Sequence, residues 1–208
     1  MTLCTIKTAF AQCAIAAALL AGVNAQATVI TFDNLASSSR VSNGYADLNW
    51  GDNTYVYSQA NYSGNGNGSI FPSASMAVYN GSGVRTVTVS GGLFDLNGAY
   101  FTGWGSNGRA VSYTSTSVTL TGYLAGMSMG SVTSALAANA FTWVAADFGT
   151  IDSFTITNSG NGSQWWLMDN LTLNEARSSG NSVPEPGSLA LLGLGLGALA
   201  MVRRRKSA

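Results

Sequence analysis

Carboxylates are the only side chains between residues 28 and 180 that offer acid–base chemistry. This central region contains no His, Cys or Lys, because both cysteines and both lysines lie near the ends of the chain. Catalysis by Ser-His-Asp, Cys-His or Ser-Lys groups is therefore excluded, and zinc lacks its usual His and Cys ligands. The eight remaining acids are Asp33, Asp47, Asp52, Asp95, Asp147, Asp152, Asp169 and Glu175.

Paired carboxylates can hydrolyse glycosides, so a carboxylate-dependent glycosidase is one hypothesis. However, the sequence has no Glu-x-Asp-x-Glu strand and no Asp-Thr/Ser-Gly motif, and Glu175 is the only glutamate of the central region. We therefore expect that this protein is not an enzyme.

A hard cation such as Ca²⁺ is the metal that these residues suit, since it binds Asp, Asn and backbone oxygens. Asp33 follows the first predicted strand, and Asp169 lies in the last one. Counting by twos places Asp169 on the apolar face with Trp165 and Leu167, where a buried acid needs a partner. Asp33 and Asp169 are the candidate ligands of a structural Ca²⁺. The favoured alternative is that both carboxylates cap turns or accept backbone hydrogen bonds.

Aromatic side chains are the second group of candidates, because flat, uncharged rings stack on sugar faces. Trp165 and Trp166 are adjacent, so in a strand they point to opposite faces. If Trp165 belongs to the core, Trp166 is the exposed ring. Trp166, Trp104 and Tyr100 are accordingly the predicted sugar-binding residues, although a core position is the commoner role for any single aromatic side chain.

The charge balance argues against nucleic acid as a partner. Charged residues make up 9% of the chain and hydrophobic residues 46%. Within residues 28–180, four arginines face eight acids, and this net negative charge disfavours binding to a phosphate backbone. Low charge and exposed sheet edges instead favour self-association, so a structural surface protein with no sugar ligand is an alternative.

The elements that would position these residues are short β-rich runs separated by Gly, Asn and Ser clusters. Residues 28–175 therefore predict one all-β domain, an antiparallel β-sandwich of jelly-roll-like type. The predicted strands are Val29–Phe32, Tyr45–Trp50, Thr54–Ser58, Arg85–Val89, Ala99–Trp104, Val111–Thr114, Ser117–Leu124, Phe141–Ala145, Ser153–Thr157 and Gln164–Leu173. Residues 63–69 predict a loop, residues 158–162 a tight turn, and residues 135–140 a helical turn.

Residues 1–27 have the features of a secretory signal peptide. Lys7 precedes an apolar run, and Ala25-Gln26-Ala27 fits cleavage after small residues at Ala25 and Ala27. Because Cys4 and Cys13 lie in this segment, the mature chain would have no disulfide. We expect a signal helix here that is removed after export.

The C-terminal segment, residues 183–208, has three parts. Pro184, Glu185 and Pro186 come first, an apolar stretch over residues 187–202 follows, and the basic tail over residues 203–206 contains Arg203, Arg204 and Arg205. The stretch predicts a short transmembrane helix whose cations stay in the cytoplasm. Residues 176–182 predict a polar linker. A permanent single-span anchor is the alternative to a removable segment.

This tripartite tail resembles the PEP-CTERM sorting signal of Gram-negative bacteria. The resemblance implies recognition by a membrane-embedded exosortase, cleavage near the motif after transient residence in the inner membrane, and release or transfer to the cell surface. It also implies an association with exopolysaccharide.

The central region resembles the body domain of many PEP-CTERM proteins, a jelly-roll-like sandwich similar to carbohydrate-binding modules. The segments that carry this resemblance are Gly44-Tyr45, Leu48–Trp50, Gly92–Leu96, Ala99–Trp104, Gly122-Tyr123, Gly126 and Met168–Leu171. It implies no particular binding residue. The combined prediction is an exported, exosortase-processed, non-catalytic surface or matrix protein that associates with exopolysaccharide.

Overall fold

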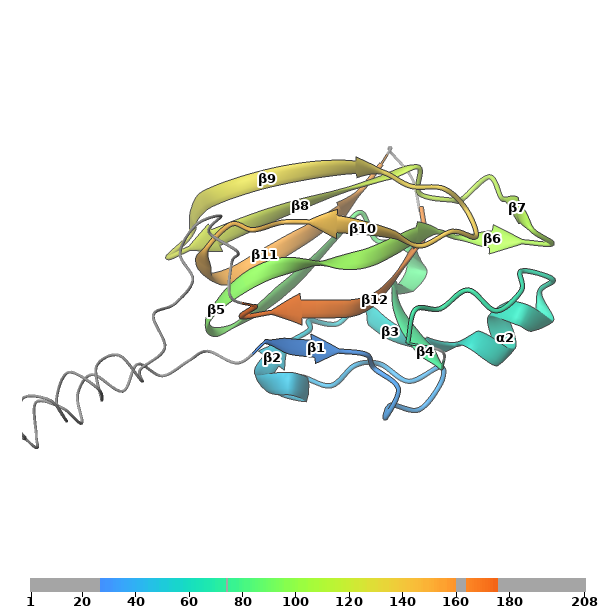
Figure 1. Ribbon diagram of the computed structural model, residues 1–208, viewed down its shortest axis with the longest axis horizontal. Helices are drawn as coiled ribbons and strands as arrows, with labels where there is room; N and C mark the ends of the chain where they lie inside the picture. The colour runs from blue at the N-terminus through green and yellow to red at the C-terminus, as the bar shows by residue number, and fades with distance from the viewer. Residues whose placement is uncertain (1–26, 74, 160–163, 176–208) are drawn as a thin grey trace, which may run out of the picture. The chain divides into compact units, whose positions relative to one another are not determined.

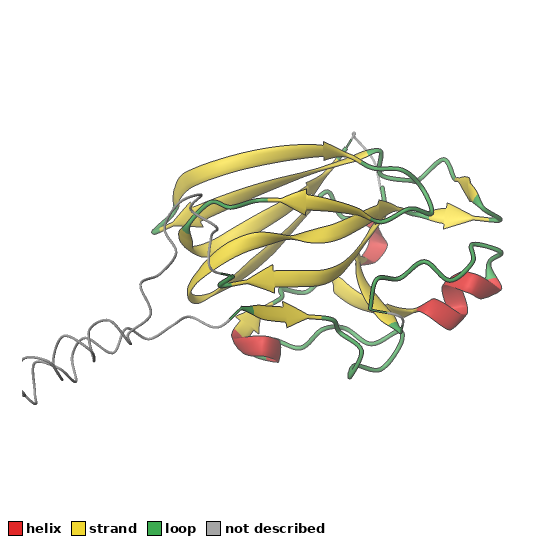
Figure 2. Cartoon of the chain, in the orientation of Figure 1, coloured by secondary structure: helices red, strands yellow, loops and turns green. Residues whose placement is uncertain are grey.

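The computed structural model describes residues 27–73, 75–159 and 164–175, and these residues form an almost purely β structure (Figure 2). All pairs of named strands are antiparallel. The strands are β1 (Thr28–Ile30), β2 (Leu48–Asn49), β3 (Thr54–Ser58), β4 (Met76–Asn80), β5 (Thr86–Gly103), β6 (Gly105–Ser106), β7 (Arg109–Ala110), β8 (Ser117–Leu124), β9 (Met127–Ala135), β10 (Thr142–Ala145), β11 (Thr150–Asn158) and β12 (Trp166–Leu173). The short helical segments are η1 (Tyr45–Asp47), α2 (Gln59–Gly64) and η2 (Gly81–Gly83).

The long strand β5 belongs to two sheets. Its first part, Thr86–Asp95, pairs with β11, and its second part, Leu96–Gly103, pairs with β12. The first sheet therefore contains β3, β4, β12, the second part of β5, and β10, with β1 also paired to β12. The second sheet contains β2, the first part of β5, β11, β8 and β9 (Figure 1).

The main core lies between the inner faces of these sheets, as the alternation of apolar and polar residues in the strands predicts. The first sheet contributes Val56, Val78, Phe101, Trp166 and Met168, and the second contributes Val87, Val89, Val118, Leu120, Phe154 and Ile156. An all-β antiparallel sandwich is therefore confirmed, whereas the jelly-roll-like connectivity stays a prediction.

A β-bulge in β12 reverses which side chains face this core. The pairing of β12 with β5 shifts register between Asp169 and Thr172, and Asn170 has a φ of 49°. Before the bulge Trp166 and Met168 are core residues, and after it Leu171 and Leu173 are. Counting by twos along the whole strand was therefore wrong, because one extra residue changes the face of every side chain beyond it.

Several element predictions need correction. Residues 45–50 form a 3₁₀ turn followed by a two-residue strand, residues 111–114 form a turn, and residues 135–140 contain no helix. Helix α2 overlaps the loop predicted over residues 63–69, while β4 and β9 were not predicted. The Ser and Gly content of β9 and its flanks hides its strand character from a reading based on β-propensity.

The two terminal predictions lie outside the described residues. These are the signal helix with Ala25 and Ala27, and the transmembrane helix over residues 187–202 with its flanking motif and basic tail. Within the part of the chain that the structure describes, no helix is long and apolar enough to cross a membrane.

Phe101→Ala tests the core between the sheets. The Phe101 ring is fully buried and packs against Trp166 at a centroid distance of 5.7 Å. We expect the free energy of unfolding, measured by urea denaturation, to fall by about 3–5 kcal/mol. Leu93→Ala is the control, since Leu93 is 71% exposed and its truncation should change stability by about 0.5 kcal/mol or less. Equal effects of the two substitutions would contradict this core.

Candidate functional site

A row of four partly exposed aromatic rings lies on the outer side of the first sheet. We call Tyr55, Tyr79, Trp165 and Tyr113 the aromatic strip. Successive ring centroids are 6.0 Å apart from Tyr55 to Tyr79, 6.0 Å from Tyr79 to Trp165, and 5.6 Å from Trp165 to Tyr113. Three rings are half-buried, and Tyr113 is 42% exposed.

Backbone pairing sets the order of these rings. Tyr55 in β3 is the register partner of Tyr79 in β4, so the two side chains lie on the same face. The Trp165 amide donates to the carbonyl oxygen of Tyr113 at 2.8 Å, which fixes the turn over residues 111–116 beside the start of β12. The four rings therefore come from four separate segments that the sheet aligns.

Trp104 supports the aromatic strip from below. It is only 6% exposed, and its ring lies 5.2 Å from Trp165 and 5.6 Å from Tyr79. Tyr57 and Tyr62 pack against Trp104 in turn, and Tyr62 is delivered by α2. This second, smaller core packs against the rings of the strip, and the four rings remain partly exposed.

The polar atoms of the aromatic strip are available to a ligand. The hydroxyls of Tyr55, Tyr79 and Tyr113 and the indole N–H of Trp165 have no hydrogen-bond partner among residues 27–73, 75–159 and 164–175. Burial, together with the nearby hydroxyls of Tyr55 and Tyr57, raises the pKa of Tyr79. The Tyr79 hydroxyl therefore remains a neutral donor, and the strip combines ring faces with uncharged donors as sugar hydroxyls require.

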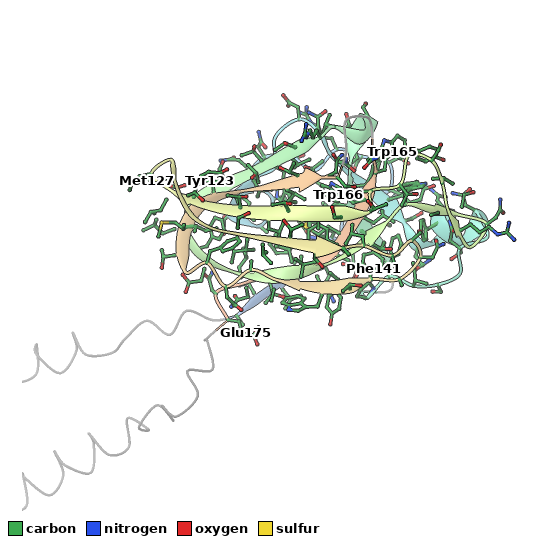
Figure 3. All side chains as sticks on the ribbon, turned by 90° about the horizontal axis from the view of Figure 1, so that it is seen from above. Tyr123, Met127, Phe141, Trp165, Trp166 and Glu175 are labelled. Atoms are coloured by element: carbon green, nitrogen blue, oxygen red, sulfur yellow. The ribbon has the colours of Figure 1, made fainter. Side chains whose placement is uncertain are left out.

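The predicted sugar-binding residues, Trp166, Trp104 and Tyr100, lie outside the aromatic strip. Trp166 is fully buried in the main core, so the expectation that it is the exposed ring was wrong, and Trp165 takes that position (Figure 3). Trp104 is buried beneath the strip. Tyr100 is half-buried and contacts Trp143, its register partner on β10, at 5.2 Å. Because of the bulge in β12, the sequence could not show which of Trp165 and Trp166 faces the main core.

Asp33 and Asp169 lie close together and share Ser73 as a hydrogen-bond donor. The Ser73 hydroxyl and the Met76 amide both donate to Oδ1 of Asp33 at 2.9 Å. The Ser73 amide donates to Oδ2 of Asp169 at 2.9 Å, and the Asn170 amide donates to Oδ1 of Asp169 at 2.7 Å. Both acids thus accept backbone hydrogen bonds, as the favoured alternative to a metal site expected.

The surroundings of Asp33 and Asp169 suit a structural role better than glycoside hydrolysis. Asp169 is fully buried, so neither substrate nor water has access to it as a glycosidase would need. Within the described residues, no group of three or more His, Cys, Asp or Glu side chains could hold a metal ion. A Ca²⁺ ion between Asp33 and Asp169 stays a prediction, and it would have to take its remaining oxygens from other groups.

Comparison with known protein families identifies a motif in the C-terminal segment. Residues 182–206 match the family described as the PEP-CTERM protein-sorting motif. The chain therefore carries a PEP-CTERM sorting motif at its C-terminus, as the sequence predicted. This motif implies processing by an exosortase, export and sorting to the cell surface.

The β domain is similar to two carbohydrate-binding modules. One is TmCBM61, solved in complex with beta-1,4-galactotriose, with 13% identity, a TM-score of 0.37, and coverage of 67% of this chain and 98% of that one. The other is GH31 CBM32-2 bound to GalNAc, with 18% identity, a TM-score of 0.30, and coverage of 72% and 94%. No curated protein matches the chain.

The buried acid makes stability depend on pH. Burial and the neighbouring Asp33 carboxylate raise the pKa of Asp169 from 3.8 to about 6, against the opposing effect of its hydrogen bonds. The folded state therefore holds this proton more tightly than the unfolded chain. The stability that it contributes is full below about pH 4, is lost as the pH rises through 6, and amounts to about 3 kcal/mol.

Urea denaturation at about pH 4 and about pH 7.5 measures this effect. Asp169→Asn should flatten the pH dependence, because the variant has no proton to lose, whereas Asp47→Asn on the surface should leave it unchanged. A wild-type slope that survives in Asp169→Asn would contradict the assignment. Added Ca²⁺ that stabilises wild type at the higher pH, but not Asp169→Asn, would establish the cation site.

Proposed function

We propose that this protein is an exported, exosortase-processed, non-catalytic protein of the cell surface or extracellular matrix that binds exopolysaccharide through the aromatic strip. The observation that carries the proposal is the row Tyr55–Tyr79–Trp165–Tyr113, whose rings follow one another at nearly equal distances. Successive sugar units of one chain can contact successive rings, which makes an extended polymer a better ligand than a single sugar.

The distribution of charge in the domain also supports an uncharged polysaccharide as the ligand. The four rings carry no charge, and residues 110–146 contain no charged side chain. Binding would therefore rest on stacking and hydrogen bonds, and we expect it to respond weakly to salt. The absence of His, Cys and Lys from residues 28–180 supports a role in binding rather than catalysis.

Both terminal segments of the chain would be cleaved during export and sorting. The signal peptide would be removed after Ala27, and exosortase would cleave near Pro184, Glu185 and Pro186 while the basic tail holds the segment in the inner membrane. The jelly-roll-like domain would then reach the surface or the medium without either segment.

Affinity electrophoresis in gels that contain the producer's own exopolysaccharide tests the sugar-binding role. Wild-type protein should be retarded, and Tyr113→Ala should bind several-fold to roughly tenfold more weakly, because one stacking contact is lost. Tyr123→Ala is the matched control, since Tyr123 is a half-buried tyrosine of β8 in the second sheet. An unretarded wild-type protein, or equal retardation of wild type and Tyr113→Ala, would sink the proposal.

The mass of the protein recovered from the culture medium or outer surface tests both trimming events. We expect a polypeptide that begins at Thr28 and lacks the segment from the Pro-Glu-Pro motif onward. Replacing Pro184, Glu185 and Pro186 by alanine should leave the C-terminal segment attached and keep the protein in the membrane fraction. Recovery of the intact chain from the soluble cytosol would refute the export route.

A further inference from the structure

The edge strand β9 ends the path of hydrogen-bonded strands, and among the described residues its only strand partner is β8. The order of strands is β3-β4-β12-β5-β11-β8-β9 (Figure 1). At the opposite end, residues 38–41 cover β3, because Ser38 and Val41 donate to β3 carbonyls and the Val56 amide donates back to Ser39. Within residues 27–73, 75–159 and 164–175, one end of the path is thus covered by another segment and the other end is open.

The hydrogen-bond phase of β9 shows which backbone groups point to this open edge. The Leu136 amide donates to the Thr116 carbonyl at 2.8 Å, so the residues of β9 that bond to β8 alternate from this point. Between them, Thr133 and Ser131 lie opposite Thr119 and Thr121, with hydroxyl pairs at 2.8 Å and 3.1 Å. Close side chains are typical of pairs that do not share backbone bonds.

It follows that the N–H and C=O groups of Ser131, Thr133 and Ala135 point away from β8. Their N–H groups have no hydrogen-bond partner within the described residues, and the only bond to a carbonyl of the three is a long one of 3.3 Å from Ser134 Oγ to Ala135. All three residues are exposed. The edge therefore offers three successive donors and acceptors in strand geometry.

The sequence of β9 lacks the features that usually prevent strand addition. Edge strands are commonly protected by Lys, by Pro, by charges or by shortness. β9 is nine residues long, contains no Pro, and lies in the uncharged region of residues 110–146. Its register shift against β8 lies near Gly130, so residues 131–135 remain regular. The other strands of the described sheets that pair on one side only are shorter, since β10 has four residues, β1 three and β2 two.

We propose that β9 pairs with β9 of a second copy of this chain, antiparallel and about a two-fold axis through Thr133. Thr133 would then lie opposite Thr133 of the partner subunit, and Ser131 opposite Ala135 of the partner subunit. A regular, uncharged edge strand can form antiparallel backbone hydrogen bonds with an identical strand. A second copy of this chain therefore needs no further complementary feature to pair with β9. This inference goes beyond sugar binding and does not depend on it.

The expected strength of this contact is modest. Pairing over five residues buries less than the standard protein interface, so the dimer should be weak and concentration-dependent. On a surface or in a matrix where many copies are held close together, weak contacts act jointly, and a dimer would present two aromatic strips to one polymer.

Opposite charges at position 133 provide the test. In sedimentation velocity on the mature protein, wild type should associate as concentration rises, whereas Thr133→Lys and Thr133→Glu alone should associate about two- to fivefold more weakly because like charges meet at the axis. An equimolar mixture of the two variants should restore association. Thr133→Val is the control, because it introduces no charge at the axis and should associate as wild type does.

Amide hydrogen exchange gives a second readout, since exchange at Ser131, Thr133 and Ala135 should slow as wild-type concentration rises. Circular dichroism establishes that each variant is folded. A wild type that stays monomeric, a Thr133→Lys variant that associates as wild type does, or a mixture that fails to associate would overturn the proposal. Tyr113→Ala should associate normally, which separates this inference from sugar binding.

Discussion

The hydrogen bonds of one buried carboxylate hold the first sheet in its observed arrangement. Asp169 accepts from the amide of Asn170 within the β12 bulge and from the amide of Ser73 in the loop before β4. Ser73 in turn donates to Asp33, which follows β1. Three segments far apart in sequence are thereby joined at the point where β12 changes the direction of its side chains. Burying an acid is costly, and this burial is the main reason that the pKa of Asp169 is raised.

The consequence of the bulge is a division of aromatic side chains between two roles. Trp166 and Phe101 fill the main core, where their rings contribute burial. Trp165, on the other face, joins tyrosines from β3, β4 and the turn over residues 111–116 in a row that water can reach. Trp104 lies beneath this row and keeps it in place. A strand with perfect alternation would have placed Leu171 and Leu173 with Trp165 rather than with Trp166.

The two sheets have outer faces of different character. The first is aromatic, and it is the face to which the proposed polysaccharide binding belongs. The second carries Thr and Ser hydroxyls paired between neighbouring strands, such as Thr119 with Thr133. The second sheet also ends in the unprotected edge of β9. Binding and self-association would therefore use separate surfaces, so that both can operate at once on an exported protein held among copies of itself.

The sequence alone determined the all-β class, the absence of His, Cys and Lys from residues 28–180, and the sorting segment predicted over residues 183–208, because composition and linear order define them. The strands β8 and β11 could be predicted since alternation is regular there, as could β12 as an element. Tertiary structure decided the site. The face of Trp165 depends on a bulge, the neighbourhood of Tyr113 depends on β12, and the open edge of β9 depends on which strands pair. Such relations join residues distant in the chain, and no local pattern of residues encodes them.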